Sequence, residues 1–206
     1  MATDYPVGMN IDYPDRKLSR LTSFFRIFTV IPILIILELI MYNGVQFSGK
    51  DGATAATGLG LVVLPLVLML LFRKKYPKWW YEWNLNLSMF AYRVASYFYL
   101  MTDVYPSTDE EQNVHLEMPY PDASGLNRWL PLVKWFLAIP HIFVLIFLNI
   151  AAVFVIIITW FAILFTGKFP KGLFDYLLGV MRWNFRVMSY ALIMITDKYP
   201  PFSLQA

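Results

Sequence analysis

Long apolar stretches alternate with basic, proline-containing segments along the chain. Two such stretches, at about residues 25–43 and 56–72, each approach the roughly 20 residues that a helix needs to cross a bilayer. A polar, glycine-containing segment, 43–57, separates them. This pattern predicts a transmembrane hairpin in the first half of the chain.

The second half contains one longer apolar region, residues 132–165. A single helix over that region would be about 51 Å long, whereas the hydrocarbon core of a bilayer is about 30 Å thick. We therefore expect two spans, at about 132–148 and 151–165, joined by a tight turn. One strongly tilted helix is the alternative.

Each apolar region is followed by a basic turn that contains a proline, and then by a helix-length segment, at about 80–101 and 173–195. Polar residues recur there at helical spacing, and the remaining positions are rich in Trp, Tyr and Phe. This pattern is typical of an amphipathic helix that lies in the headgroup layer. A third span with its arginine facing the protein interior is the alternative.

The two halves of the chain repeat one another. Tyr-Pro dipeptides recur in the same order, and the sequence Thr-Asp-Val-Tyr-Pro at 102–106 returns as Thr-Asp-Lys-Tyr-Pro at 196–200. We interpret the chain as a tandem duplication, with a first copy in 1–106, an acidic linker in 107–117 and a second copy in 118–206.

The repeat favours a hairpin in the second copy as well. Pro32 and Pro77 are 45 residues apart, and their counterparts Pro140 and Pro170 are 30 residues apart. The difference equals the length of the polar segment 43–57. We therefore interpret the second copy as the same hairpin with its turn trimmed.

Composition favours a membrane environment. Of 206 residues, 58% are hydrophobic and 15% are charged, against about 25% charged in a typical soluble domain. We therefore expect an all-α membrane protein with about four spans. The chain has no cysteine, which excludes disulfides, thiolate metal sites and cysteine nucleophiles. Its first 15 residues show no cleavable signal peptide.

The basic residues predict an orientation. Hairpins would place every Lys and Arg except Lys50 on one side of the membrane, and the positive-inside rule makes that side cytoplasmic. We expect a multi-pass protein with both termini in the cytoplasm. The net charge of +3 does not indicate nucleic-acid binding, because the positive residues flank apolar segments.

No catalytic, metal-binding or cofactor-binding motif is recognisable, so we expect neither an enzyme nor a bound cofactor or metal. Glu38 is the only acidic residue within a predicted span, and such a residue is a candidate for proton or ion transport. It lies near the end of its span, and its counterpart is Ile146. His141 lies in an apolar region without a second histidine nearby, so we expect a packing role.

Charged residues that recur in both copies are the stronger site candidates: Asp15 and Asp122, Arg20 and Arg128, Arg93 and Arg186, and Asp103 and Asp197. Arg93 would pair with Asp103, and Arg186 with Asp197, as structural ion pairs that fix the interfacial helices. The alternative is a headgroup site, in which both arginines bind lipid phosphate.

Several motifs of the second copy are similar to those of a known family. They are Tyr120-Pro121-Asp122, the stretch from Arg128 to His141, the stretch from Trp160 to Gly172 and the stretch from Thr196 to Leu204. The chain resembles a bacterial membrane family known only as domain of unknown function 4389. The resemblance implies a small protein of the bacterial inner membrane, and it supplies no activity, substrate or catalytic residue.

These observations together predict a non-enzymatic accessory or scaffold subunit of a larger membrane assembly. Its partners would be membrane lipids and either other membrane proteins or further copies of itself. A lipid-binding or membrane-shaping protein that acts through hairpins and amphipathic helices is one alternative. A small transporter or channel is the other, although the predicted spans offer almost no polar path.

Overall fold

The computed structural model describes residues 5–14, 17–41, 63, 66–108 and 110–205. The loop predicted at 43–57 and the first part of the span predicted at 56–72 lie outside these residues. The elements are β1 (Gly8–Ile11), α1 (Arg20–Met41), η1 (Met69–Arg73), α3 (Lys78–Phe98), β2 (Val114–Glu117), α4 (Leu130–Thr166), α5 (Lys171–Met188) and η2 (Ser189–Ile193).

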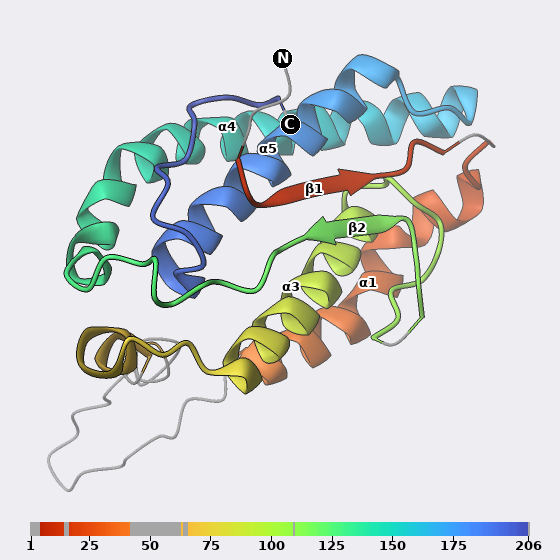
Figure 1. Ribbon diagram of the computed structural model, residues 1–206. Helices are drawn as coiled ribbons and strands as arrows, with labels where there is room; N and C mark the ends of the chain where they lie inside the picture. Colours follow the sequence, from red (N-terminus) through yellow and green to blue (C-terminus); the bar gives the residue numbers. More distant parts are fainter. Residues whose placement is uncertain (1–4, 15–16, 42–62, 64–65, 109, 206) are drawn as a thin grey trace, which may run out of the picture.

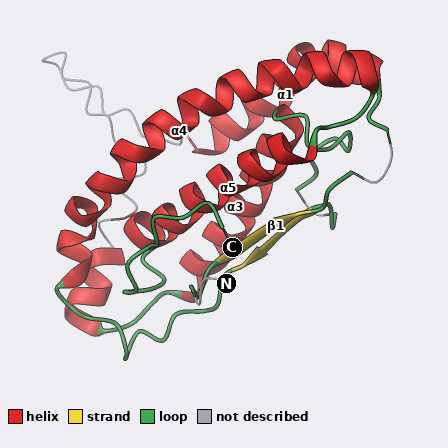
Figure 2. Ribbon diagram, turned by 90° about the horizontal axis from the view of Figure 1, so that it is seen from above, coloured by secondary structure: helices red, strands yellow, loops and turns green. Residues whose placement is uncertain are grey.

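The elements form three layers (Figures 1 and 2). The two strands pair with each other; β1 contacts α5 and β2 contacts α3. Helices α3 and α5 in turn pack against α1 and α4, which also contact each other. In the view of Figure 2, α1 and α4 therefore lie on the side of the middle layer that is remote from the strands.

The small sheet is a correction to the all-α prediction. The two strands are antiparallel, and Met9 faces Leu116 in the register. Each strand has only four residues, which is too short for an alternating apolar and polar pattern to stand out in the sequence. The fold is otherwise helical in the described part of the chain.

The turn predicted near Asn149 is wrong, because α4 runs without a break for 37 residues, or about 55 Å. No glycine or proline stands at the expected turn, and the Asn149 side chain donates to the Leu145 carbonyl at 2.7 Å within the helix. Helix α4 ends instead at Gly167, whose left-handed conformation (φ 70°) suits glycine. The alternative that the sequence left open, one long helix, is therefore the observed structure of this region.

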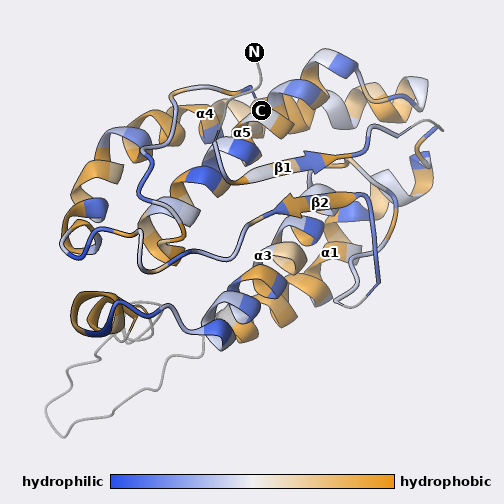
Figure 3. Cartoon of the chain, in the orientation of Figure 1, coloured by the Kyte–Doolittle hydropathy of each residue, from blue (hydrophilic) through white to orange (hydrophobic). Residues whose placement is uncertain are grey.

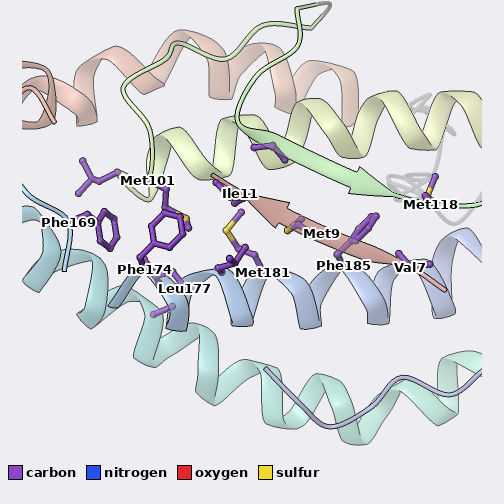
Figure 4. Packing of buried hydrophobic residues seen from close by; sticks show 14 of the residues in the cluster. Val7, Met9, Ile11, Met101, Met118, Phe169, Phe174, Leu177, Met181 and Phe185 are labelled. Atoms are coloured by element: carbon purple, nitrogen blue, oxygen red, sulfur yellow. The ribbon is translucent and has the colours of Figure 1, made fainter. Parts of the chain in front are cut away.

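Apolar side chains fill the space between the sheet and the middle helices. Figure 4 shows Met9 of β1, and Val7 just before that strand, directed toward Met181 and Phe185 of α5. Phe185 is fully buried and meets Tyr92 of α3 edge to face, with ring centroids 5.3 Å apart. This cluster joins the two halves of the chain into one core.

Helices occur where the sequence predicted interfacial ones. Helix α3 covers Lys78–Phe98, and α5 with η2 covers Lys171–Ile193. Pro77 and Pro170 are their N-caps, in extended backbone. The apolar side of α5 is, however, covered by α4 and β1, so α5 leaves almost no large apolar side chain exposed for a headgroup layer.

Glycine positions in α5 allow a matched test of this packing. A methyl group added at Gly179 would lie 2.8 Å from Leu204 Cβ and from the Leu204 carbonyl oxygen, whereas one added at Gly172 would meet nothing within 4 Å. We expect Gly179→Ala to lower the free energy of unfolding by about 1–3 kcal/mol and to expose the carboxy-terminal segment to proteolysis. Gly172→Ala should raise it by about 0.4–1 kcal/mol. Thermal unfolding in one detergent compares them, and equal effects would contradict the packing.

Candidate functional site

A buried ion pair connects the start of α1 to the segment that follows α3. The Arg26 side chain is 2% exposed, and its Nη2 lies 2.5 Å from Asp103 Oδ1. Its Nη1 donates to the Thr102 carbonyl at 2.7 Å, and its guanidinium carbon lies 3.9 Å from the centre of the Tyr97 ring. The other Asp103 oxygen accepts the Ser19 backbone N–H at 2.7 Å, just before α1 begins.

The second half of the chain repeats this arrangement. The Lys134 side chain is 1% exposed, and its Nζ lies 2.8 Å from Asp197 Oδ1 and 2.8 Å from the Thr196 carbonyl oxygen. It also lies over the Tyr190 ring, 5.1 Å from the centre. Asp197 Oδ2 accepts the Asn127 backbone N–H at 2.6 Å, near the start of α4. Each aspartate thus holds a buried cation and a helix start together.

The ion pairs predicted from the sequence are therefore wrong in one partner. Asp103 and Asp197 do form pairs, but with Arg26 and Lys134 rather than with Arg93 and Arg186. The sequence did contain a signal, since a basic residue stands at the same position inside both apolar stretches. The sequence could not show that this basic residue lies close to the aspartate, because about 70 residues separate the two partners along the chain.

Arg93 and Arg186 have a different role. Both are buried, at 6% and 3% exposure. Arg93 donates to the Ser107 carbonyl at 2.8 Å, and Arg186 donates to the Ser203 carbonyl at 2.6 Å. Burial lowers the pKa of Arg186 from its ordinary value. These contacts fix the segments that follow the two Thr-Asp sequences, and burial leaves little of either guanidinium accessible to a lipid headgroup.

The remaining charged candidates lie at the surface or outside the described residues. Asp15 lies outside them. Arg20 is exposed and donates to the Phe165 carbonyl at 3.0 Å, and Arg128 is exposed just before α4. Asp122 accepts the Ser124 backbone N–H and hydroxyl, which hold its pKa below the ordinary value. It forms a local turn and contacts neither ion pair.

The two candidates within apolar segments differ in burial. Glu38 is exposed on α1. His141 is fully buried, accepts the Trp183 indole N–H on Nδ1 at 3.0 Å and stacks on Phe202 with ring centroids 3.9 Å apart. His141 therefore packs α4 against α5 and the carboxy-terminal segment. Among the described residues, no group of three or more His, Cys, Asp or Glu could hold a metal ion.

Helices α1 and α4 have many exposed apolar side chains. We call the exposed Phe, Ile, Leu and Val side chains of these two helices the apolar surface. Figure 3 shows apolar residues along most of both helices. Phe28, Phe136, Phe143, Phe154 and Phe165 are 61–77% exposed, and many Ile and Leu side chains between them are exposed as well. Monomeric soluble proteins rarely expose contiguous apolar patches beyond a few hundred Å².

The buried residues of α4 form one narrow stripe, and half-buried residues beside it also contact the rest of the protein. The stripe contains Pro131, Lys134, Ala138, His141, Leu145, Ala152, Thr159 and Ile163, which are its buried residues. Their spacing of mostly three or four residues, or multiples of seven, keeps them on one face of a helix. The opposite face of the helix belongs to the apolar surface.

Basic side chains stand at both ends of α4. At its carboxy-terminal end, the Leu18 N–H donates to the Gly167 carbonyl at 3.0 Å, which brings Lys17 and Arg20 beside Lys168. At its amino-terminal end, Lys74 and Lys75 line a shallow depression of about 450 Å³ together with residues 120–124, a few residues before Arg128.

The described fold is that of a mostly helical protein with two helices, α1 and α4, that are long and apolar enough to cross a membrane. Residues 129–203 match the family described as Domain of unknown function (DUF4389). The matched part of the chain contains α4, α5 and η2, in agreement with the resemblance of its motifs. No curated protein and no solved structure matches the chain.

The ion pairs give a direct stability test. We expect Asp103→Asn and Asp197→Asn each to lower the free energy of unfolding by about 3–5 kcal/mol, because each leaves a buried cation without its counterion. Asp122→Asn is the control, since an asparagine oxygen can accept the same bonds from Ser124 at the surface. Thermal unfolding in a single detergent measures all three. Losses no larger than that of the control would show that the pairs do not hold the fold.

Proposed function

We propose that the protein is a non-enzymatic lipid-binding protein of the bacterial inner membrane, embedded through the apolar surface. The observation that supports it is the exposure of α4: within an apolar stretch of 18 residues in this helix, only 17% is buried. The core helix of a soluble protein can be equally long and apolar, but it is mostly buried. Water is a poor environment for this helix, because each large apolar side chain gains about 1.5–3 kcal/mol on leaving it.

The tandem duplication is part of this proposal, and equivalent contacts support it. Arg26 and Lys134 bind equivalent aspartates, as described above. The Tyr13 hydroxyl donates to the Phe169 carbonyl, and its counterpart Tyr120 donates to the Tyr76 carbonyl. The entry of each copy is thus bound to the proline turn of the other copy.

Backbone conformation gives the same correspondence. Lys74 and Gly167, just before the two proline turns, are both left-handed, with φ of 47° and 70°. Leu100 and Met194, just before the two Thr-Asp sequences, are left-handed as well, with φ of 64° and 60°. Non-glycine residues seldom adopt this conformation. Its recurrence at matching positions favours one module present twice.

An accessory or scaffold function in a larger membrane assembly is the second candidate. Strand β2 pairs only with β1 in the described part of the chain, so its other edge has backbone groups that a partner strand could bind. The transporter or channel alternative has less support. Glu38 is exposed rather than directed into the protein, and the buried polar residues of α4 are spread along a single packed stripe.

Charge introduced into the apolar surface tests the proposal. We expect Phe147→Glu combined with Phe154→Glu to release much of the protein from liposomes in a flotation assay, because each carboxylate within lipid costs about 2.5–3.5 kcal/mol. Both side chains are exposed, at 58% and 61%, so the fold should persist. Gln205→Glu, which adds a charge at an exposed site outside the apolar surface, is the control. A wild-type protein that stays in solution without detergent would refute the proposal.

A further inference from the structure

We infer that α4 does not cross the bilayer but lies along one leaflet, with both of its ends at the same headgroup layer and its exposed face among the acyl chains. This inference rests on the proposed function and specifies how the apolar surface meets the membrane. The occupant of that surface is then a single lipid leaflet. Four observations support the arrangement.

The first observation is length. Helix α4 is about 55 Å long, whereas a bilayer core is about 30 Å thick. A helix perpendicular to the membrane would extend well beyond the core at one end or both. Its last residues, Ile163 to Phe165, are as apolar as its centre, and Phe165 is 77% exposed. A helix parallel to the membrane plane keeps its whole length at one depth.

The second observation is the position of polar groups beside the middle of α4. Asn149 lies at the midpoint of α4, and its side chain contacts Asn184 of α5 at 3.4–3.5 Å. Arg182, half a turn earlier on α5, donates to the Met9 carbonyl at 2.7 Å and to the Asn10 side chain at 3.0 Å. A crossing α4 would carry Arg182 and the exposed Asn10 of β1 to the middle of the bilayer, where charged and polar groups are costly.

The third observation is the direction of the exposed face. Protein contacts occupy one side of α4, the buried stripe and the half-buried residues beside it, and the strands lie beyond α5 on that same side. One side of the molecule is therefore apolar along the full length of α4, and the other side carries the sheet (Figure 2). This is the division expected of a protein that sits in the interface rather than through it.

The fourth observation is charge. Lys17, Arg20 and Lys168 gather at one end of α4, while Lys74 and Lys75 stand at the other. A crossing helix would put one of these groups on the far side of the membrane, against the positive-inside rule. In the plane of one leaflet both groups reach the cytoplasmic headgroups, whose anionic phosphates attract them. The antiparallel hairpin that the sequence predicted would also have met this condition, but α4 is continuous.

The absence of cysteine from the natural chain makes the test clean. Single variants Arg128→Cys and Lys171→Cys place one thiol at each end of α4, and both positions are exposed. A membrane-impermeant maleimide should label both in inverted inner-membrane vesicles and neither in intact spheroplasts. If one end is labelled in vesicles and the other in spheroplasts, α4 crosses the bilayer and the inference is wrong.

Depth measurements along α4 provide a second readout. Nitroxide labels at Phe136→Cys, Phe147→Cys and Phe161→Cys, in vesicles of phosphatidylethanolamine and phosphatidylglycerol, should report one common depth. Those residues are 49–70% exposed on the lipid side. A crossing helix would change depth by about 1.5 Å per residue, or about 37 Å over this interval. Only variants that keep the wild-type thermal transition are compared.

The two proposals fail in different ways. If the protein does not float with liposomes, the proposed membrane function is wrong. If it floats but the labels show a depth gradient, or ends on opposite sides, the membrane function holds and only the one-leaflet arrangement is overturned.

Discussion

A cation buried near the start of α1 and another near the start of α4 form the interaction on which the rest of the structure depends. An unpaired charge at Arg26 or Lys134 would cost several kcal/mol in this environment, so the chain must return an aspartate to it. The Thr-Asp sequences do so, and each aspartate also accepts a backbone N–H just before the helix starts. Each Thr-Asp sequence is thereby fixed to the start of the helix, α1 or α4, that carries its cation.

This closure determines which side of the protein is apolar. Lys134 lies on the narrow stripe of α4 that faces α5, together with His141, so its charge is hidden from the exposed side. The returning segments and the two strands must then lie on the protein side of α1 and α4. The outward side therefore consists of Phe, Ile and Leu side chains. The apolar surface is a consequence of where the ion pairs hold the polar returning segments.

The sequence predicted helices at the positions of α1, α3 and α5, the proline turns and a pairing role for Asp103 and Asp197, because these follow from composition, local backbone preference and the recurring motifs. It assigned the aspartates the wrong partners, since the choice between Arg93 and Arg26 depends on packing between segments far apart in the chain. It also could not show the four-residue strands, whose pairing joins Met9 near the start of the chain to Leu116 in the segment predicted to be a linker. A sheet this short is stabilised by its contacts with α3 and α5 rather than by its own pattern.

The continuity of α4, in contrast, was readable from the sequence. Lys134, His141, Asn149 and Thr159 are the polar residues within the apolar region. At about 100° per residue, they fall within less than a quarter of the circumference of one continuous helix. A turn near Asn149 would have removed any reason for polar residues on either side of it to share a face. Their alignment requires one unbroken helix with one protein-facing stripe. The hairpin was favoured by the repeat, by the placement of the basic residues and by a length greater than the bilayer core. The arguments from length and charge hold only if an apolar helix must cross the membrane.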